Sequence, residues 1–577
     1  MMKKNTSKGE NRLPFKQKKL DKKSISQGRK SSQTSSVGEK ISGIFLILTL
    51  LFFALGNTGP IANNDYGLHL RIGEEIADSG KPVRIDNHSH TLPDAPYPDH
   101  EWLTQLWFYG WHKVFGNRGM VVLKGLLIGM ALAFAAFSIR EPASLRILIL
   151  LPILFLGFDH SHMRPHLVSW VFSALLIFLL SRRRFPFIFL LLFLWGNMHG
   201  SVLLGVGFTG LFFLEEYIRT KGKKWILWSV AAFVVPLANP GGIGIYTLFF
   251  EITGHTSFIG EWKPYAPDSL GFWLLILVFG AGAIGFLKSK PLNPFDFIRI
   301  LVLGFLGFQS SRNGVMAGIF LAPLLGKWYA PLFHRFPFPI KRSIVILCAG
   351  LIFSVLFVRV YQGKAFRFEL DHEKLPVEAV KFIKNHELQG PMFNDYNFGG
   401  YFLWKAFPEF PVFIDGRTEV YKGGVLKEYL AVSNAEDGWK RIVEKYDVRF
   451  FVIRPERKIS PVLLRDKNWE LVYFDYNAVI YVRSDLFPSL KRLRVVSPYG
   501  HRDRTKTREA TEEITYLLKE NPRFFGGYKI LAFLQYRSGN YRDAEQSLKR
   551  YLELHPEGKK VEETNSLIRG LKAKEAW

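Results

Sequence analysis

The stretch ISGIFLILTLLFFALGNTGPIANNDYGLHLRIGEEIADSG (residues 41–80) decides the fold class of this chain. Its first part, residues 41–62, contains no charged side chain and is long enough to cross a membrane as one helix. Asp65 follows at once, and the next residues are amphipathic, with Leu68, Ile72 and Ile76 on one face. We therefore expect the chain to leave the membrane near Asp65 and to continue as an interfacial helix.

The rest of the chain repeats this alternation of apolar blocks and polar gaps. It has 577 residues, of which 48% are hydrophobic and 15% aromatic, and the charged residues are concentrated between the apolar blocks. This pattern is typical of a polytopic α-helical membrane protein and excludes collagen-like, disulfide-stabilised and disordered chains. Cys348 is the one cysteine, so no internal disulfide forms. We predict eleven spans in a transmembrane domain of residues 41–360, namely 41–62, 119–139, 144–158, 166–181, 185–198, 200–217, 224–238, 271–287, 297–310, 314–330 and 343–360.

The positive charges between the spans predict the orientation. If the N-terminus is cytoplasmic, four basic clusters at residues 182–184, 219–224, 288–290 and 335–342 all fall in cytoplasmic loops, as the positive-inside rule requires. Residues 1–40 contain twelve Lys or Arg and three Asp or Glu, a net charge of +9 within a total of +26. We expect this segment to be a basic disordered cytoplasmic tail that is attracted to anionic lipid, and we do not expect it to bind nucleic acid.

The opposite set of gaps is predicted to face outward, and it carries His, Asp, Glu, Asn and Arg in place of Lys. Ionisable residues gathered at one membrane boundary indicate a site on that side. Solvated loops have a similar composition, which is the alternative interpretation. The outward gaps are the large outer loop 63–118 and the segments 159–166, 197–200, 239–270 and 310–314.

Asp65 and Glu101 are the carboxylates of this side that we select as candidate catalytic groups. A carboxylate at the membrane surface can polarise an attacking hydroxyl, although Asp65 is also suited to cap a helix N-terminus. Glu101 is preferred to Asp99 because it is fixed beside Trp102.

Basic and imidazole side chains on the same side are candidates for substrate binding. Arg164 and Arg312 suit a lipid phosphate because guanidinium binds phosphate oxygens bidentately, and snorkelling to headgroups is the alternative. Glu261 and Trp262 are expected to shape the cleft or to anchor the chain at the interface. Four histidines raise the question of zinc, but their spacing fits no closed zinc site and no cysteine joins them. They are His160, His162, His166 and His199.

Several strings of residues, in this order along the chain, resemble bacterial GT-C-type membrane glycosyltransferases, a group related to oligosaccharyltransferases and protein mannosyltransferases. The resemblance covers about residues 41–485. The strings are Asp65-x3-His69-Leu-Arg-x-Gly73-Glu, His100-Glu101-Trp102-Leu103, Arg164-Pro165-His166, Trp195-x-Asn197-x-His199-Gly200, Asn239-Pro240-x-Gly242, Glu261-Trp262, Arg312-Asn313, Asn394-Asp395-Tyr396-x2-Gly399-Gly400-Tyr401 and Phe413-Ile414-Asp415-Gly416-Arg417.

The resemblance implies transfer of a sugar from a polyprenyl-phosphate donor to an acceptor at the outer face of the bacterial cytoplasmic membrane. It implies that Asp65 is the general base near the acceptor hydroxyl. Glu101, the second candidate carboxylate, is selected from the loop residues themselves, and a solvated residue before a helix is the alternative. Many members of the group have two acids at the first position, whereas Asn63 and Asn64 precede Asp65 here. A two-acid metal site is therefore not expected, and a divalent cation is left open. The side chains expected to bind substrate are His69, Arg71, His100, Arg164, His166, Asn197, His199, Glu261, Trp262 and Arg312.

Residues 361–490 predict an extracytoplasmic α/β domain. Helical patterns at 376–386 and 439–446 alternate with apolar runs that are typical of short strands. This domain contains no phosphate-binding loop, no GxGxxG string and no nucleophile elbow. A role of this domain in covering the membrane cleft is a hypothesis. The predicted strands are PMFND, PVFIDGR, RFFVI, ELVYFD and AVIYVR.

Residues 500–577 predict a helical end. The string from Gly539 to Pro556 resembles the second helix of a tetratricopeptide repeat, and one convincing copy is found. Because such repeats need neighbours to bury their faces, we expect this copy to pack on the α/β domain or to bind a protein partner through residues 505–577.

Two other functions are consistent with the sequence. A non-catalytic membrane scaffold would gather envelope-assembly enzymes through the C-terminal repeat-like region and would not need the Asp65 carboxylate. A transporter of lipid-linked sugars would need buried charge pairs within its spans, and the apolar blocks contain little beyond Lys124, Glu215 and Glu216. We therefore prefer the glycosyltransferase.

Overall fold

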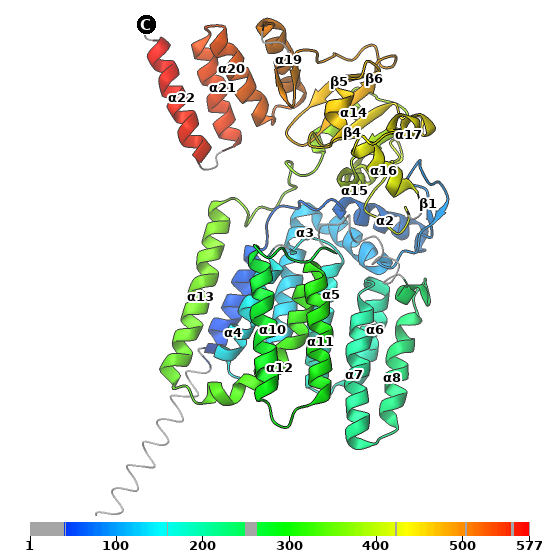
Figure 1. Cartoon of the computed structure of the whole chain (residues 1–577), viewed down its shortest axis with the longest axis vertical. Helices are drawn as coiled ribbons and strands as arrows, with labels where there is room; N and C mark the ends of the chain where they lie inside the picture. Colours follow the sequence, from blue (N-terminus) through cyan, green and yellow to red (C-terminus); the bar gives the residue numbers. More distant parts are fainter. Residues whose placement is uncertain are drawn as a thin grey trace, which may run out of the picture.

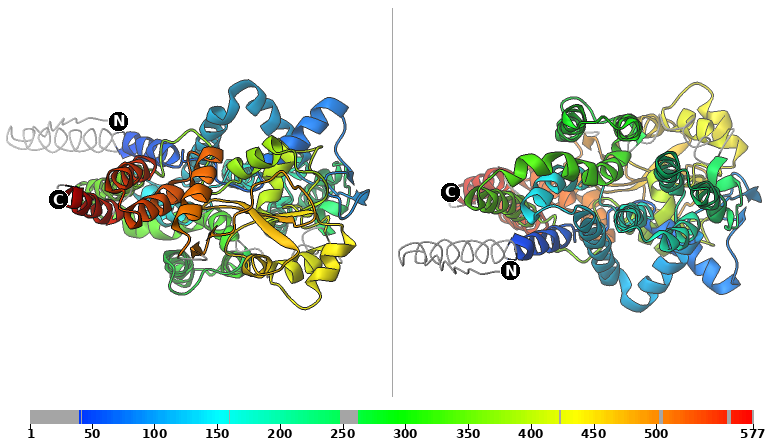
Figure 2. Two further views of the ribbon diagram at one scale, coloured as in Figure 1. Left: turned by 90° about the horizontal axis from the view of Figure 1, so that it is seen from above. Right: turned by 90° about the horizontal axis from the view of Figure 1, so that it is seen from below.

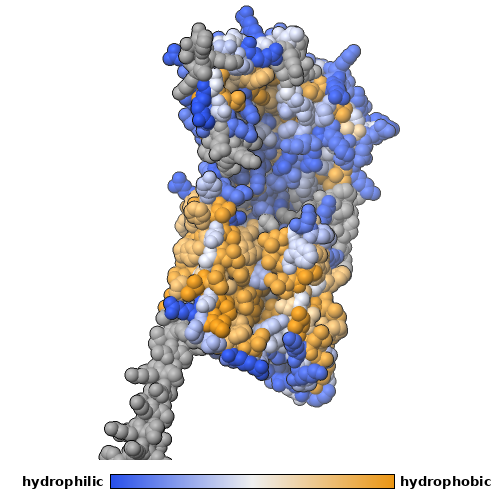
Figure 3. All heavy atoms as spheres, turned by 60° about the vertical axis from the view of Figure 1, so that its left-hand side comes forward, coloured by the Kyte–Doolittle hydropathy of each residue, from blue (hydrophilic) through white to orange (hydrophobic). Residues whose placement is uncertain are grey.

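The computed structural model of the chain describes residue 40 and residues 42–158, 160–247, 262–421, 424–501, 505–555 and 559–575. Figure 1 shows a bundle of long helices, an α/β domain on one end of it, and a group of helices at the C-terminal end of the chain. In Figure 3, apolar residues cover much of the bundle surface, and hydrophilic residues predominate beyond it. The predicted fold class, a helical membrane domain followed by a small α/β domain and a helical end, is confirmed.

The helices of the bundle coincide with the predicted spans. Within the described residues, a helix overlaps each of the eleven predicted segments. Four stretches are long and apolar enough to cross a membrane, namely Trp102–Ser138, Leu270–Lys288, Ser311–His334 and Pro339–Tyr361. The number of spans stays a prediction. The helices are Ser42–Gly56, α3 (Trp102–Ser138), α4 (Ala143–Gly157), α5 (His166–Ser181), α6 (Phe185–Met198), α7 (Val202–Thr220), α8 (Lys224–Val234) with η1 (Val235–Leu237), α10 (Leu270–Lys288), α11 (Pro294–Gln309), η4 (Ser311–Asn313), α12 (Gly314–His334) and α13 (Phe338–Tyr361).

Helix α3 joins two elements that the sequence analysis separates. The sequence predicts an interfacial helix over residues 99–110 and a span from residue 119, whereas α3 continues from Trp102 to Ser138. Gly116 interrupts the helical backbone with φ 60° and ψ −164°, a conformation that glycine adopts without a steric penalty. The part before Gly116 packs on α2 (Tyr66–Ser79), and the part after it belongs to the bundle.

The α/β domain is built on a four-stranded mixed sheet. The strand order is β3-β4-β6-β5, with β3 parallel to β4 and the other pairs antiparallel. Most strand residues are buried, because helices and loops cover both faces. The elements are α14 (Val377–Asn385), β3 (Met392–Asn394), η5 (Tyr396–Phe398), α15 (Gly399–Lys405), α16 (Val425–Ser433), α17 (Trp439–Lys445), β4 (Phe450–Ile453), α18 (Ile459–Leu463), β5 (Trp469–Phe474) and β6 (Val479–Arg483).

The outer loop 63–118 and the α/β domain share one hydrophobic core. Leu68, Ile72 and Ile76 of α2 are buried in the same cluster as the strands of the domain. The loop also contains a short antiparallel pair, β1 (Ile85–Asp86) and β2 (Ala95–Pro96). The prediction that PVFIDGR is a strand of the sheet is wrong. This segment pairs with the outer loop instead, since the Val412 amide donates to the His88 carbonyl at 3.0 Å.

The C-terminal end is helical, as predicted. Helix α19 packs on the α/β domain through Ala510, Ile514 and Leu517, which belong to the shared core. Seen from above in Figure 2, the later helices lie to one side of that domain. The assignment to a tetratricopeptide repeat and the protein partner stay predictions. The elements are β7 (Val496–Ser497), β8 (Gly500–His501), α19 (Thr507–Glu520), α20 (Phe525–Arg537), α21 (Tyr541–Leu554) and α22 (Lys559–Glu575).

Candidate active site

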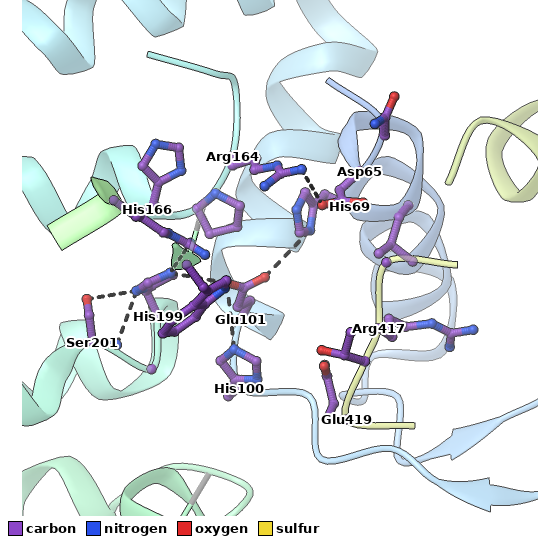
Figure 4. A pocket seen from close by; sticks show the side chains of 18 of the residues that line it. Asp65, His69, His100, Glu101, Arg164, His166, His199, Ser201, Arg417 and Glu419 are labelled. Carbon is purple, nitrogen blue, oxygen red and sulfur yellow. Dashed lines mark hydrogen bonds and ion pairs between the residues drawn. The ribbon is translucent and has the colours of Figure 1, made fainter. Parts of the chain in front are cut away.

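A cavity of about 650 Å³ lies where the helix bundle meets the outer loop and the α/β domain. Its walls come from α2, the start of α3, the turns before α5, α7 and α12, and the segments around residues 397, 418 and 430. Figure 4 shows many of these side chains pointing toward one another. Nine of the twelve predicted site residues line it: Asp65, His69, His100, Glu101, Arg164, His166, His199, Trp262 and Arg312.

Asp65 lies at the start of α2 and is held by an arginine. It occupies the N-cap position, but its side chain makes no capping hydrogen bond. Its Oδ2 lies 2.9 Å from Nη2 of Arg164, whose Nε donates to Oδ1 of Asn63 at 2.7 Å. Both contacts fix the direction of the Asp65 carboxylate, because a guanidinium binds with a defined planar geometry.

Two glycines of the α/β domain allow it to approach Asp65. A Cβ on Gly416 would lie 2.2 Å from Oδ1 of Asp65, and a Cβ on Gly400 would lie 2.4 Å from the carbonyl oxygen of Asn64. Real Cβ atoms essentially never show contacts under 3.0 Å. Both positions therefore need glycine for the domain to sit against the start of α2.

Glu101 lies among three imidazoles. The nearest ring nitrogens of His199, His69 and His100 are 3.4, 3.7 and 3.7 Å from its carboxylate oxygens. Burial lowers the pKa of His69 to about 4, so this imidazole is neutral at physiological pH. His69, which is predicted to bind substrate, turns its ring toward Glu101.

Arg312 comes from η4, just before α12, and lies on the bundle side of the cavity. Its guanidinium carbon is 5.6 Å from the centre of the Trp262 ring, and Nη2 is 3.4 Å from Nε2 of His199. The other ring nitrogen of His199 is held by the hydroxyls of Ser201 and Ser169 at 2.8 and 2.9 Å. Arg164 and Arg312 thus line one cavity, and each guanidinium group can bind phosphate oxygens bidentately.

The histidine cluster does not assemble into a metal centre in the described part of the chain, where no group of three or more His, Cys, Asp or Glu side chains is placed to hold a metal ion. Nε2 of His166 lies 2.7 Å from the carbonyl oxygen of His160, and Nε2 of His160 lies 3.0 Å from the hydroxyl of Tyr265. These contacts fix the turn before α5. Binding of a divalent cation at another place in the cavity stays an open alternative.

Two predicted substrate-binding residues do not line the cavity, and the position of a third is not described. Arg71 pairs with Glu74 and Glu75 at 2.9 Å each and does not line the cavity. Asn197 accepts from the indole of Trp102 at 3.0 Å and donates to two carbonyls, which fixes the end of α6. Glu261 lies outside the described residues.

The α/β domain supplies cavity residues that the sequence analysis does not select. These side chains follow or neighbour the Asp415-Gly416-Arg417 and Asp395-Tyr396 strings, which are quoted in the resemblance but assigned no role. A prediction of contact between these strings and Asp65 would have identified them. They are Tyr396, Asn397, Arg417, Thr418, Glu419, Tyr429 and Arg457, together with Tyr97 of the outer loop.

Arg417 ties the domain to the outer loop through a buried network of charges. Its Nη2 lies 2.6 Å from Asp415 and 2.9 Å from Asp86, and Nη1 lies 3.3 Å from Nδ1 of His88. His88 also contacts Glu75 at 2.9 Å. The neighbouring carboxylates raise the pKa of His88 despite its burial. The network fixes the segment that carries Gly416 and the residues after it.

Comparisons with known proteins give structural neighbours only. No protein-family model and no curated protein sequence matches the chain. Among solved structures, the Archaeoglobus fulgidus oligosaccharyltransferase in the apo form is similar over 77% of this chain and 74% of its own, with 9% identity and a TM-score of 0.48. ArnT from Cupriavidus metallidurans in the apo state is similar over 78% and 98%, with 12% identity and a TM-score of 0.43. Since both TM-scores are below 0.5, the proposed function rests on the cavity itself.

Proposed function

We propose that the protein is a membrane glycosyltransferase, which moves a sugar from a polyprenyl-phosphate donor to an acceptor at the outer face of the bacterial cytoplasmic membrane. The observation that carries the proposal is the convergence of nine selected side chains, from segments far apart in the sequence, on one cavity. A scaffold has no need for such a convergence of carboxylates, imidazoles and guanidinium groups.

The two arginines are the groups we assign to the donor phosphate. Arg164 and Arg312 come from the outer ends of bundle helices, where a phosphate at the membrane surface is within reach. The same side of the cavity is lined by apolar residues such as Leu203, Leu204 and Met316. In this proposal, the guanidinium groups hold the phosphate and stabilise the charge that it gains as the leaving group.

Asp65 is the proposed general base. In the transfer step, the acceptor hydroxyl oxygen forms a bond to the anomeric carbon, while the bond from that carbon to the phosphate oxygen breaks. The hydroxyl proton passes to the Asp65 carboxylate, and the polyprenyl phosphate leaves with the electron pair. Glu101 is the second proposed catalytic carboxylate, and its three imidazole neighbours hold it inside the cavity.

Asp65→Asn tests this proposal, because it keeps the shape of the side chain and removes the base. Envelope glycans are compared in a deletion strain that expresses wild type, Asp65→Asn or Asp94→Asn at equal membrane levels. Asp94 is an exposed residue of the same outer loop, and asparagine tolerates its positive φ of 62°.

The transferase is supported if a glycan is lost on deletion and returns with wild type and Asp94→Asn but not with Asp65→Asn. Full restoration by Asp65→Asn removes Asp65 from catalysis and favours the scaffold. Purified protein in nanodiscs, incubated with radiolabelled lipid-linked sugars from the same strain, then measures transfer directly.

A further inference from the structure

The cavity has two ends of opposite charge. Figure 4 shows Arg164 on one side of Glu101, and His100 and Glu419 on the other. We call Asp99, Glu101 and Glu419 the acid end. Glu101 and Glu419 line the cavity, and Asp99 is buried next to them at 7% exposure. A phosphate at the arginines leaves the acid end free for a different chemical group.

The cations nearest to the acid end are already engaged. Arg417 is held by Asp415 and Asp86, and Arg457 pairs with the buried Asp395. Within the described part of the chain, Glu419 takes part in no ion pair, and the His100 ring, 3.7 Å from Glu101, is the titratable base beside it. In the described chain, no arginine or lysine forms an ion pair with Asp99, Glu101 or Glu419, and Arg417 acts on the charge of Glu419 without direct contact.

Several buried polar atoms around the acid end have no hydrogen-bond partner in the described chain. They include Oε1 of Gln105, which is an acceptor, and Oδ2 of Asp99, which is an acceptor when the carboxyl group is ionised. Nδ1 of His69, a cavity residue with 6% exposure, also has none. Buried polar atoms in native proteins are nearly always paired. The unpaired oxygens of Gln105 and ionised Asp99 would accept hydrogen bonds from a ligand that donates them, and Nδ1 of His69 can donate or accept.

The protonation of the acid end agrees with a missing cation. Burial raises the pKa of Asp99 to about 7, and burial also raises the pKa of Glu419, with the charge of Glu101 acting in the same direction. His69 is neutral because burial lowers its pKa to about 4. A bound cation would stabilise the ionised carboxylates and so lower both raised pKa values.

Building on the transferase proposed above, we propose that the acid end binds the protonated amino group of a sugar substrate. An ammonium group offers three hydrogen-bond donors and one positive charge, which match the unpaired acceptors and the unbalanced carboxylates. A neutral hydroxyl group supplies a hydrogen-bond donor but does not neutralise the carboxylates, and an anionic group is repelled by them. Glu419, supplied by the α/β domain, is the residue that sets this preference.

Saturation-transfer NMR on the full-length protein in nanodiscs tests the proposal with three probes: glucosamine, glucose and N-acetylglucosamine. Glucosamine is expected to bind about tenfold more tightly than either neutral sugar, since a hydrogen bond to a charged group is worth roughly that factor in affinity. Glu419→Gln and Asp99→Asn are each expected to remove the preference. Glu409→Gln, a change at an exposed carboxylate of the same domain, is expected to keep it.

Equal binding of glucosamine and glucose, or a preference that survives Glu419→Gln, overturns the amine site. Binding of polyprenyl phosphate is measured in the same preparation. If wild type prefers glucosamine but does not bind polyprenyl phosphate, the transferase is rejected and the amine site is kept. If wild type binds polyprenyl phosphate but shows no preference for glucosamine, the amine site alone is rejected. In cells of the Glu419→Gln strain, an amino sugar that accumulates on the lipid carrier shows that the donor carries the amine, and an amino sugar in the acceptor that stays unmodified shows that the acceptor carries it.

Discussion

Gly416→Ala is the sharpest test of how the α/β domain contributes to the site. The added Cβ would lie 2.2 Å from Oδ1 and 2.8 Å from Cγ of Asp65. To reach even 3.0 Å from Oδ1, the loop or the carboxylate must move by at least 0.8 Å. Because Arg164 and Asn63 hold the start of α2, the displacement has to disturb either the Arg164–Asp65 ion pair or the segment that carries Glu419.

The expected effect is a large loss of transfer with a modest loss of stability. A displacement of about 1 Å in a catalytic group costs about 100-fold in rate, which corresponds to about 2.7 kcal/mol. Overpacking by one methyl group costs about 1–3 kcal/mol of folding free energy. We therefore expect transfer by Gly416→Ala to fall about 100-fold, while the protein stays folded in nanodiscs. Gly424→Ala is the matched control, because a Cβ there meets no atom within 4 Å.

The assay measures transfer of the radiolabelled sugar by purified variants at equal concentration, together with their thermal unfolding. The double variant with Asp65→Asn adds a second criterion. If Gly416→Ala acts through Asp65, it has little further effect once the base is gone, and the two losses are not additive. Wild-type transfer by Gly416→Ala would refute the close contact between the domain and Asp65. Additive losses would show that the displacement acts through the segment that carries Glu419 and not through Asp65.

Four further changes test other parts of the structure. Arg312→Gln is expected to weaken binding of polyprenyl phosphate about tenfold in nanodisc titrations, because it removes one charge-assisted contact. Arg417→Met leaves buried carboxylates unpaired and should destabilise the protein by about 3–5 kcal/mol, measured by thermal unfolding. Folding raises the pKa of His88, so protonated His88 stabilises the folded protein fully below the unfolded pKa of about 6.5, and this stabilisation is lost as the pH rises through the folded pKa. The stability advantage of wild type over His88→Gln should therefore shrink from pH 6 to pH 9. Asp99 holds its proton up to a pKa of about 7, so wild type should lose stability from pH 4 to pH 7 relative to Asp99→Asn.

Hydropathy predicts the bundle because each span is a local property of the sequence. Any apolar segment of sufficient length must form a helix in lipid, since its backbone groups find no other partners there. A helix therefore overlaps each predicted segment of the described chain. Charge pairs between helices are not local. The buried Arg299 pairs with Glu215 of α7 and with Asp296, and the sequence analysis found only the glutamate.

The predicted site is most complete where a string of residues lies at the end of a helix next to the α/β domain. Asp65, Arg164 and Arg312 meet because their helix ends lie at the same end of the bundle. Asn197 belongs to such a string but points into the protein, where it holds Trp102 and two carbonyls. The direction of a side chain within a turn depends on packing partners, which sequence spacing does not specify.

The residues of the α/β domain could not be predicted because they depend on a contact between distant parts of the chain. Periodicity predicts that residues 411–417 are a buried strand, and they are buried, but their partner is the outer loop and not the sheet. That choice of partner brings Gly416 to Asp65 and places Glu419 in the cavity. An apolar strand pattern predicts that a segment is buried and paired, but it does not predict which segment is the pairing partner.

The hydrophobic core that the outer loop shares with the α/β domain also limits the experiments that can test the role of the domain. Deletion of residues 365–485 would expose Leu68, Ile72 and Ile76 of α2, whose core partners lie in the deleted domain. It would also leave Asp86 and His88 without Arg417. Loss of activity in such a deletion would follow from the collapse of the outer loop alone. Glu419→Gln and Gly416→Ala leave the core intact, so only such single substitutions separate a domain that covers the cavity from one that takes part in its chemistry.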